Sequence, residues 1–380
     1  MGNVKKYLVL AVVAFSVGCS SEVLKFSFIG DIMAHDVNFM MKDFSVMYEN
    51  VAEYLLSDDL TFGNLEFPID NSLPYSTYPN FNVHNEYVEA VINAGVDVFS
   101  LANNHSNDQG SGGVMATIDS VKMLQRKYDK AEHRKIYFSG LRQTAFDGLD
   151  VQIICKNNLR IAFVSVTEVL NIYNESRHKV QFYYYNKEYR REFTEKVAEI
   201  KNRTKCDLFV LSVHTAEPEY VRKTTDLRKE YFRGLAESGA DIIWAHHPHV
   251  VQAWEKYITQ DKREVLIMYS MGNFISGQRY RMNYKNPGAF REYTGDSYIL
   301  KVAVSRGWYN KKFEYKLVPI QITTKVDYSA AQIKLYEFNE AFIDGLESDK
   351  LKDYYRIRFN LMKEQLGEIL PWEKITVPDK

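Results

Sequence analysis

The stretch Leu24-Lys25-Phe26-Ser27-Phe28-Ile29-Gly30-Asp31 sets the pattern for this chain, because an apolar run typical of a buried strand ends in a glycine and a carboxylate. Two later stretches repeat this order. Asn103-Asn104-His105 follows the apolar run 96–101, and Ala245-His246-His247-Pro248-His249 follows the run 241–244. Carboxylate, amide and imidazole groups are ligands of hard and borderline metal ions. The three clusters therefore predict a metal site at the carboxyl edge of a sheet, and a candidate hydrolase.

The rest of the chain alternates between apolar runs and segments of helical periodicity. Further strand-like runs span 160–166, 208–213 and 265–270, and helical spacing occurs in 114–128, 189–202 and 227–238. This alternation predicts an α/β fold with a mainly parallel sheet covered on both faces. Two hairpin-like segments, 151–166 and 251–270, fit a layered sandwich better than one open sheet.

The sequence divides into three parts. Residues 1–18 combine Lys5-Lys6, a short apolar run and small residues, as in a secretory signal peptide. Residues 19–325 hold the alternating pattern, and residues 326–380 predict a helical C-terminal appendage with amphipathic helices at 330–343 and 350–369. Ser16-Val17-Gly18-Cys19 resembles a bacterial lipobox, which implies a lipidated Cys19 in the cell envelope, and in the outer membrane of a diderm host. An uncleaved N-terminal anchor is the alternative.

The charge balance bears on nucleic-acid binding, and the cysteine content bears on disulfide formation. The chain has 48 basic and 49 acidic side chains, and this balance argues against a nucleic-acid-binding face, which would be strongly basic. Cys155 and Cys206 remain after the signal segment. An exported protein permits a disulfide between them, and two buried free thiols suit their positions equally well.

Histidines concentrate at the ends of the predicted strands. Five of the nine in the chain, His105, His214, His246, His247 and His249, occupy such positions. Because side chains alternate along an extended backbone, we expect His247 and His249 to share one face, with Pro248 stiffening the loop. With Asp31, Glu66, Asn104 and His214 they form a mixed oxygen and nitrogen set that suits Mn²⁺, Zn²⁺ or Fe. Burial of these groups in a purely structural hydrogen-bond network is the alternative.

Six short motifs occur in the order found in the CapA family. They are Gly30-Asp31-Ile32-Met33, Gly63-Asn64-Leu65-Glu66, Ser100-Leu101-Ala102-Asn103-Asn104-His105, Ser212-Val213-His214, His246-His247-Pro248-His249-Val250-Val251-Gln252 and Tyr269-Ser270-Met271-Gly272-Asn273-Phe274. Over residues 24–280 the chain resembles a bacterial capsule, or poly-γ-glutamate, synthesis protein of that family. The family is similar to calcineurin-like metallophosphoesterases, which implies a four-layer αββα sandwich with a two-metal site.

The resemblance also implies roles for individual residues. Asp31 and His249 would bind the first metal, Glu66 would bridge, and Asn104, His214 and His247 would bind the second. His105 would be the general acid, and Asp31 would belong to the catalytic centre with it. Asn103, His246, Glu219 and Asn273 would lie behind these ligands or at the rim. Met33 stands where the phosphoesterase pattern has a histidine, and His35 follows two residues later. One ion and two ions therefore both remain open.

The function implied is that of an exported lipoprotein in the synthesis of a capsule or poly-γ-glutamate-type envelope polymer. We expect a metal-dependent phosphoesterase that acts on an anionic envelope polymer or a phosphate ester. The alternative is a non-catalytic binding or scaffold subunit beside a membrane synthase. The nearly complete ligand set favours the enzyme, and Met33 favours the scaffold.

Two other segments are open to two interpretations. Arg279-Tyr280-Arg281 with Lys285 could hold a polyanion near the site, or could form a solvated loop. Phe182-Tyr183-Tyr184-Tyr185 could be a stacking platform for a polymer, or the edge of a buried strand or helix.

Overall fold

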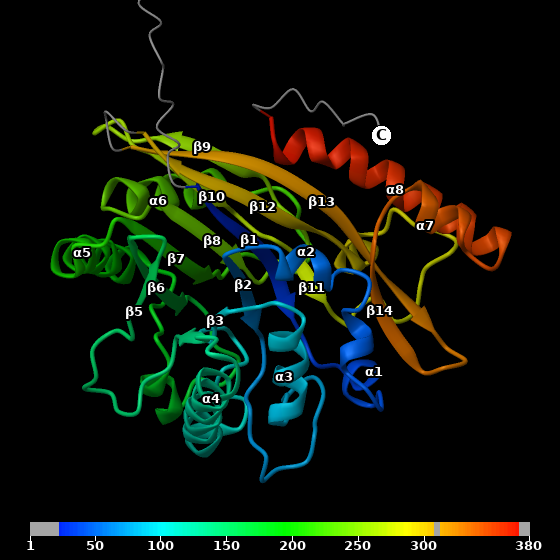
Figure 1. The fold of residues 1–380 in the computed structure, drawn as a ribbon, viewed down its shortest axis with the longest axis horizontal. Coiled ribbons are helices and arrows are strands. Elements are labelled where there is room, and N and C mark those ends of the chain that lie inside the picture. The colour runs from blue at the N-terminus through cyan, green and yellow to red at the C-terminus, as the bar shows by residue number, and fades with distance from the viewer. Residues whose placement is uncertain (1–22, 308–311, 372–380) are drawn as a thin grey trace, which may run out of the picture.

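Two β-sheets packed face to face form the centre of the molecule (Figure 1). The computed structural model describes residues 23–307 and 312–371, so the expected signal segment 1–18 and Cys19 lie outside the described residues. The first sheet has the strand order β14-β13-β12-β1-β2-β3-β4, with β11 beside β1. Its strands are β1 (Val23–Ile32), β2 (Leu60–Leu65), β3 (Val98–Ser100), β4 (Tyr137–Ser139), β11 (Asn273–Ile275), β12 (Asp296–Arg306), β13 (Phe313–Asp327) and β14 (Gln332–Glu337).

The second sheet has six strands in the order β5-β6-β7-β8-β10-β9. They are β5 (Gln152–Lys156), β6 (Leu159–Thr167), β7 (Leu208–His214), β8 (Ile242–His246), β9 (Trp254–Ile258) and β10 (Glu264–Met268). The central strands of each sheet run parallel, β1 to β4 in the first sheet and β6, β7, β8 and β10 in the second. Both expected hairpins are confirmed, because β5–β6 and β9–β10 pair in antiparallel fashion.

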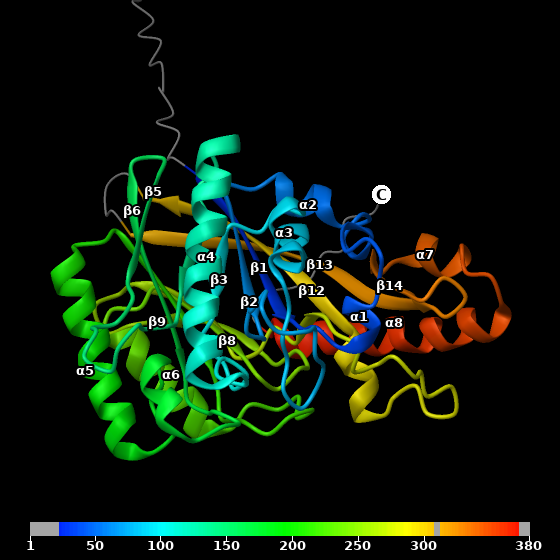
Figure 2. The same ribbon diagram turned by 90° about the horizontal axis from the view of Figure 1, so that it is seen from below.

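Helices cover the two outer faces and complete an αββα sandwich. Figure 2 shows α3 (Asn85–Asn93) and α4 (Gly110–Glu132) on the outside of the first sheet. On the second sheet lie α5 (Lys187–Thr204) and α6 (Asp226–Glu237). The remaining helices are α1 (Asp36–Phe39), α2 (Ala52–Leu56), α7 (Glu340–Asp344), α8 (Asp349–Ile369) and the short 3-10 helices Ser45–Met47, Glu175–Lys179 and Phe290–Gly295. The predicted four-layer α/β architecture is therefore confirmed.

Alternation along the strands divides the apolar side chains among three cores. Phe26 and Phe28 of β1 point between the sheets, whereas Ile29 and Ile32 pack under the outer helices. Between the sheets, Phe28 stacks on Phe62 with ring centroids 4.7 Å apart. The indole of Trp244 in the opposite sheet donates a hydrogen bond to the Ile29 carbonyl at 3.1 Å. The two sheets are thus joined one residue before the Gly30-Asp31 motif.

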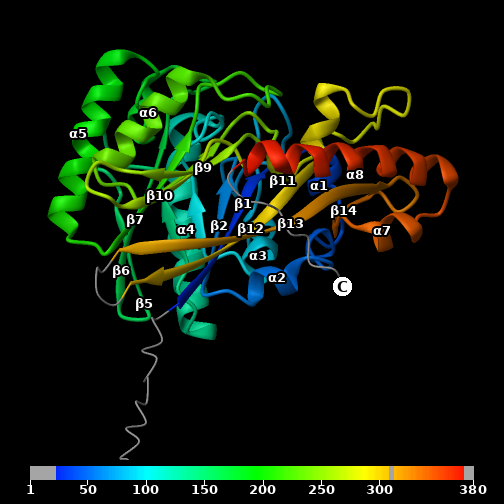
Figure 3. The same ribbon diagram turned by 90° about the horizontal axis from the view of Figure 1, so that it is seen from above.

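The C-terminal segment departs from the all-helical prediction. Strand β13 crosses position 326, and β14 occupies part of the range 330–343 that was expected to be a helix. In β14 only Ile333 and Leu335 are buried, which is the two-residue period of a strand. The second expected helix is confirmed as α8, which lies along β12 and β13 (Figure 3). Its side chains Tyr354, Tyr355 and Phe359 belong to the core between the sheets.

The two cysteines in the described part of the chain carry free thiols. Cys206 is buried, as one of the two expectations had it, but Cys155 is exposed on β5.

Gly30 is required by the close approach of two backbones. The amide of Asp31 donates to the Gly272 carbonyl at 2.9 Å, and a Cβ at position 30 would lie 1.8 Å from that oxygen. We expect Gly30→Ala to lower the free energy of unfolding by about 3 kcal/mol, because β1 and β11 must separate. Urea denaturation measures the change. The matched control is Gly234→Ala in α6, where no atom lies within 4 Å of the added carbon. Equal stability of the two variants would contradict the packing argument.

Candidate metal centre

The carboxyl ends of both sheets meet at one cluster of polar side chains. Asp31 lies at the end of β1 and is in register with Asn64 of β2 and Asn273 of β11. In the other sheet, His214 ends β7 and is in register with His246, which ends β8. Asp31, Glu66, His214 and His246 are all buried. The expectation that side chains at strand ends converge is therefore met by two sheets that face each other.

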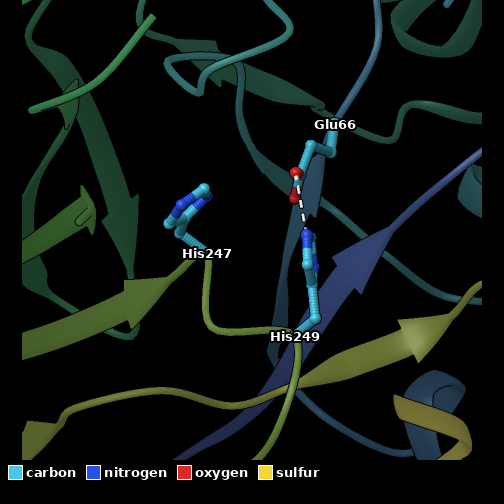
Figure 4. Close-up of side chains that lie close together, drawn as sticks. All are labelled: Glu66, His247 and His249. Atoms are coloured by element: carbon cyan, nitrogen blue, oxygen red, sulfur yellow. Dashed lines mark ion pairs between the residues drawn. The ribbon is translucent and has the colours of Figure 1, made fainter. Parts of the chain in front are cut away.

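Glu66 is the centre of this cluster (Figure 4). Its Oε1 lies 3.8 Å from His249 Nε2 and 3.9 Å from His214 Nε2. Two triads, Glu66–His247–His249 and Asp31–Glu66–His214, each offer ligand atoms that all lie within 4.8 Å of one another. These spacings suit a shared ion, since ligands 2.0–2.2 Å from one Zn²⁺ lie about 3–4 Å apart. The protein thus has buried His, Asp and Glu clusters that could hold a divalent metal ion, and Glu66 belongs to both.

Buried oxygens without hydrogen-bond partners favour a cation in this cluster. Among the described residues, the buried oxygens Glu66 Oε1 and Asn104 Oδ1 have no hydrogen-bond partner. An unpaired buried carboxylate oxygen is costly, and such groups in native proteins are normally satisfied. A divalent ion is a partner that suits a carboxylate, an amide oxygen and neutral imidazoles at once. The residues present therefore fit the group that the resemblance implies.

The pKa values in the cluster follow from burial. Burial, with the negative charges of Asp31 and Glu219 nearby, raises the pKa of Glu66 well above its usual value. Burial, with the neighbouring His249, lowers the pKa of His247 to about 3. Burial and His247 likewise lower the pKa of His214. The two imidazoles are therefore neutral at physiological pH, which is the form that binds metals.

Asp31 is held by neighbours on three sides. Asn64 Nδ2 donates to Asp31 Oδ1 at 2.8 Å. His246 Nδ1 lies 3.1 Å from the same oxygen, and His249 Nδ1 lies 3.2 Å from Oδ2. Burial alone would raise the pKa of Asp31, but hydrogen bonds and charge from these two histidines outweigh it and hold the pKa well below the usual value. Asp31 is therefore ionised at physiological pH, unlike a carboxyl whose pKa is raised as that of Glu66 is.

The loop that carries His247 and His249 is a strained turn and not an extended strand. Strand β8 ends at His246, and His247 and His249 have φ angles of 97° and 57°. These left-handed values are rare for residues other than glycine, and such strain is found mainly at functional sites. The expected alternation along a strand is therefore wrong here. The turn brings both imidazoles to Glu66 instead, and the Tyr220 amide supports it by donating to the Pro248 carbonyl at 2.9 Å.

His105 lies outside both triads and has its own support. Its Nδ1 lies 2.7 Å from Asp108 Oδ2, and both side chains are buried. The Asn171 amide lies 3.2 Å from His105 Nδ1, and the Phe81 ring packs edge-on against the imidazole. The side-chain oxygen of Asn103 accepts from the His105 amide at 3.2 Å. His105 is thus a positioned imidazole that does not share the ligand cluster.

The remaining predicted site residues lie around the cluster. Asn103 donates to the Leu65 carbonyl at 2.7 Å and so fixes the loop beside Glu66. Asn104 donates to Asn171 Oδ1 at 3.2 Å, which leaves its own oxygen unpartnered among the described residues. His246 packs against Trp244, and Asn273 Oδ1 lies 3.0 Å from His249 Nδ1. Glu219 is exposed on the loop after β7, within electrostatic reach of Glu66.

The first-strand histidine of the phosphoesterase pattern has no replacement in either triad. Met33 is buried among apolar side chains of the outer core. His35 uses Nδ1 to accept a hydrogen bond from the Gly277 amide at 3.1 Å, and it belongs to neither triad.

Three residues around the site were missed by the sequence reasoning. Asn64 lies in the motif 63–66, two residues before Glu66, and this spacing was a usable signal. Asp108 follows His105 by three residues, a spacing that could have suggested the pair. Asn171 carried no local signal, because it reaches His105 only through the loop after β6.

The two ambiguous segments are now resolved in part. Arg279 is buried and pairs with Asp296 at 2.6 Å, so it is part of the interior and not of a polyanion-binding loop. Tyr184 is exposed, whereas the central carbon of the Arg190 guanidinium lies 3.6 Å from the centre of the Tyr185 ring.

Comparison with known proteins gives two curated relatives. The capsule biosynthesis protein CapA of Bacillus anthracis is 28% identical over 269 residues, which cover 68% of this chain and 61% of that protein. The PGA biosynthesis protein CapA of Bacillus subtilis (strain 168) is 24% identical over 271 residues, covering 68% of this chain and 65% of the relative. This chain therefore spans less than two thirds of the length of either relative.

A solved structure of a hypothetical protein from Thermus thermophilus aligns with 78% of this chain and 98% of its own, with a TM-score of 0.44 and 14% identity. In the described part of the chain, no helix combines the length and the apolar character needed to cross a bilayer.

The match to a family model covers the part of the chain that carries the site. Residues 25–278 match the family described as bacterial capsule synthesis protein PGA_cap, and this range includes Asp31, Glu66, His214 and His249. The expected membership of the CapA family is confirmed by this match and by the two Bacillus relatives. The chain belongs to the bacterial capsule synthesis protein family PGA_cap.

Proposed function

We propose that this protein is a metal-dependent phosphoesterase that acts in the synthesis of a capsule or poly-γ-glutamate-type envelope polymer. The observation that supports this most strongly is the buried Glu66 carboxylate, which faces His214 and His249 and has an oxygen without a hydrogen-bond partner among the described residues. The names of the two Bacillus relatives, capsule and PGA biosynthesis proteins, support the biological setting. The substrate class is an anionic envelope polymer or a phosphate ester.

Six residues would hold one or two ions. The resemblance implies that Asp31, Glu66 and His249 hold a first ion and that Glu66, Asn104, His214 and His247 hold a second. The structure instead groups Glu66 with His247 and His249, and Glu66 with Asp31 and His214. Mn²⁺, Zn²⁺ and Fe are compatible with these donors. A bound ion would supply Lewis acidity towards a phosphoryl oxygen. The protein itself supplies orientation, because Asn64 and His246 fix Asp31 and Asn273 fixes His249.

His105 is suited to proton transfer. Asp108 accepts at Nδ1, which fixes the tautomer. Nε2, which lies 3.3 Å from the Asn171 amide nitrogen, is the atom that would serve the leaving-group oxygen. The Tyr78 and Phe81 rings pack edge-on against the imidazole, which is buried. The separation of His105 from the two triads supports its proposed role as the proton donor.

His105→Ala should lower the rate of phosphoester hydrolysis by ~10²–10⁴ while bound metal and fold are kept. A substrate with a nitrophenolate leaving group should suffer least, because this group departs without protonation. Steady-state kinetics with a good and a poor leaving group, together with metal analysis, measure the effect. The control His133→Asn changes an exposed histidine with positive φ at the end of α4, a conformation that asparagine tolerates. An undiminished rate with the poor leaving group would remove His105 from the mechanism.

A second candidate function is a non-catalytic binding or scaffold subunit that works beside a membrane synthase. The observation in its favour is Met33, which stands in the sequence where the phosphoesterase pattern has a ligand histidine and which packs in the outer apolar core. The same kinetic experiment separates the two functions. Wild-type protein that is inactive with every divalent ion tested would favour the scaffold.

We further propose a lipid anchor on Cys19 and placement in the cell envelope, at the outer membrane in a diderm host. The support is the lipobox-like sequence 16–19 and the capsule biosynthesis relatives. Cys19→Ser should leave an unprocessed precursor that no longer partitions into the detergent phase of a Triton X-114 extraction. A variant that matures and partitions as the wild type does would refute the anchor, and Cys155→Ser provides the control for cysteine loss.

A further inference from the structure

A cationic cleft of about 320 Å³ lies next to the turn that carries His247 and His249. One wall, Val251–Ala253, begins two residues after His249. The other walls are Arg222–Thr224, Lys229 of α6, and the end of α8. The volume lies at the lower end of the range for small-molecule sites, so the cleft accommodates a few side-chain-sized groups.

Positive charge dominates the lining. Arg222, Lys223 and Lys229 face one carboxylate, Glu368, although the chain as a whole has a net charge of −1. Among the described residues, neither Arg222 nor Lys223 forms an ion pair with a carboxylate, and Lys229 reaches only the exposed Asp226 at 3.8 Å. Three cations in a concave site, two of them without an ion pair among the described residues, attract an anion more strongly than scattered surface lysines do.

Buried amides hold the walls in place. Gln252 donates to the Val221 carbonyl at 2.7 Å and accepts from Thr224 at 3.3 Å. Gln365 of α8 donates to the Val251 carbonyl at 2.9 Å. Both glutamine side chains are buried. Arg222 is itself positioned, because its guanidinium lies 4.4 Å from the centre of the Tyr293 ring. A site built in this way loses little ordering entropy when a ligand binds.

The same loop connects the cleft to the candidate metal centre. Residues 219–223 begin at Glu219, near Glu66, and end in the wall of the cleft. Between these points the Tyr220 amide donates to Pro248, and the Tyr220 ring lies 6.4 Å from the His249 ring. A chain molecule with regularly spaced anionic groups could therefore contact the cleft and the centre together.

We infer that the cleft is a subsite for an anionic polymer segment, with carboxylate or phosphate groups paired to Arg222, Lys223 and Lys229. The link between this subsite and the metal centre rests on the proposed function, whereas the binding itself does not. A concave cleft favours a chain with protruding anionic groups over a flat membrane surface. Lipid headgroups are the outcome against which the polymer is tested.

The test uses the full chain in detergent, treated with a chelator, and titrated calorimetrically with a short γ-linked glutamate oligomer. Lys223→Gln with Lys229→Gln should weaken binding by about tenfold, as expected for the loss of two partly exposed ion pairs. The control Lys130→Gln with Lys205→Gln makes the same charge change at the ends of α4 and α5. These ends lie away from the carboxyl edge of the strands. A γ-linked glutamine oligomer should not bind.

Three results would overturn the inference. The cleft variant could bind the oligomer as tightly as the wild type does, or the control variant could lose as much affinity for it. The cleft variant could also lose binding to anionic phospholipid vesicles while it still binds the oligomer. The outcome is independent of catalysis, because the chelated protein is used. If the wild type hydrolyses no phosphate ester but the cleft variant still binds the oligomer more weakly, the proposed function fails and the subsite stands.

Discussion

Glu66→Gln should remove most of the bound metal and abolish metal-dependent activity, because this residue belongs to both ligand triads. The substitution keeps the shape of the side chain and removes its charge, so the carboxylate ligand is lost without leaving a cavity. For the wild type, free metal at about a hundred times its Kd stabilises the folded state by about 2.7 kcal/mol, and the variant should lose this increment. Elemental analysis and thermal unfolding with and without added ion measure the two effects.

Without metal, the difference in stability between the wild type and Glu66→Gln should have the opposite sign. Burial raises the pKa of Glu66 in the folded state, so its contribution to stability is present at low pH and is lost as pH rises through the raised value. Metal-free wild type should therefore become less stable relative to Glu66→Gln as pH rises above about 4.5, the ordinary range for Glu. Added metal should make the wild type more stable than Glu66→Gln.

The matched control for Glu66→Gln is Asp241→Asn. Asp241 is a buried carboxylate at the start of β8, the edge of the sheet opposite the cluster, where it pairs with Lys201 at 2.7 Å and with Arg263 at 2.9 Å. Asp241→Asn should be less stable than the wild type, but its ratio of bound metal to folded protein should be unchanged. Full metal content in Glu66→Gln would remove Glu66 from the site.

Asp296→Asn should lower the free energy of unfolding by about 3–5 kcal/mol, because it leaves two buried guanidinium groups without their counter-ion. Asp296 Oδ1 lies 2.6 Å from Arg279 Nη1, and Oδ2 lies 2.6 Å from Arg358 Nη2. All three side chains are buried. Since Arg358 lies on α8 and Arg279 on the loop after β11, the variant should loosen the helix from the sheet. Guanidinium denaturation measures the loss.

The pH dependence of this network has the opposite sign to that of Glu66. Burial alone would raise the pKa of Asp296, but Arg279 and Arg358 hold it below the usual value. Its contribution is therefore present above about pH 4, the ordinary range for Asp, and is lost as pH falls through the lowered pKa. This acid-dependent loss should be missing from Asp296→Asn.

A surface ion pair between α7 and α8 provides the control. Arg356 of α8 pairs with Asp344 at 3.2 Å, and both side chains are exposed to a large degree. Asp344→Asn should cost at most about 1 kcal/mol, because solvent screens such pairs. A similar cost for Asp296→Asn would show that the buried network adds no more than a surface contact.

The sequence by itself determined the layers and most of the candidate ligands. The run from Leu24 to Asp31 predicted a strand that ends in a carboxylate, and β1 is that strand. Alternation of apolar runs with helical periods predicted an α/β fold with a mainly parallel sheet, because hydrophobic period is a local property that the chain reveals directly. The four-layer αββα order was implied by the resemblance to the CapA family. The motifs around Glu66, His214 and His249 predicted residues that do converge, since parallel strands bring their carboxyl ends to one edge.

Tertiary structure decided which of these residues meet and what the others do. Glu66 follows β2 of the first sheet and His214 ends β7 of the second, so packing between the sheets, as of Phe62 against Trp244, sets the distance between them. The run 332–337 is too short for its sequence pattern to distinguish a strand from a helix. It forms the strand β14 because it pairs with β13. Arg279 is buried because Asp296 and Arg358, distant in the sequence, come to neutralise it. Such contacts depend on long-range pairing, which no local pattern in the sequence encodes.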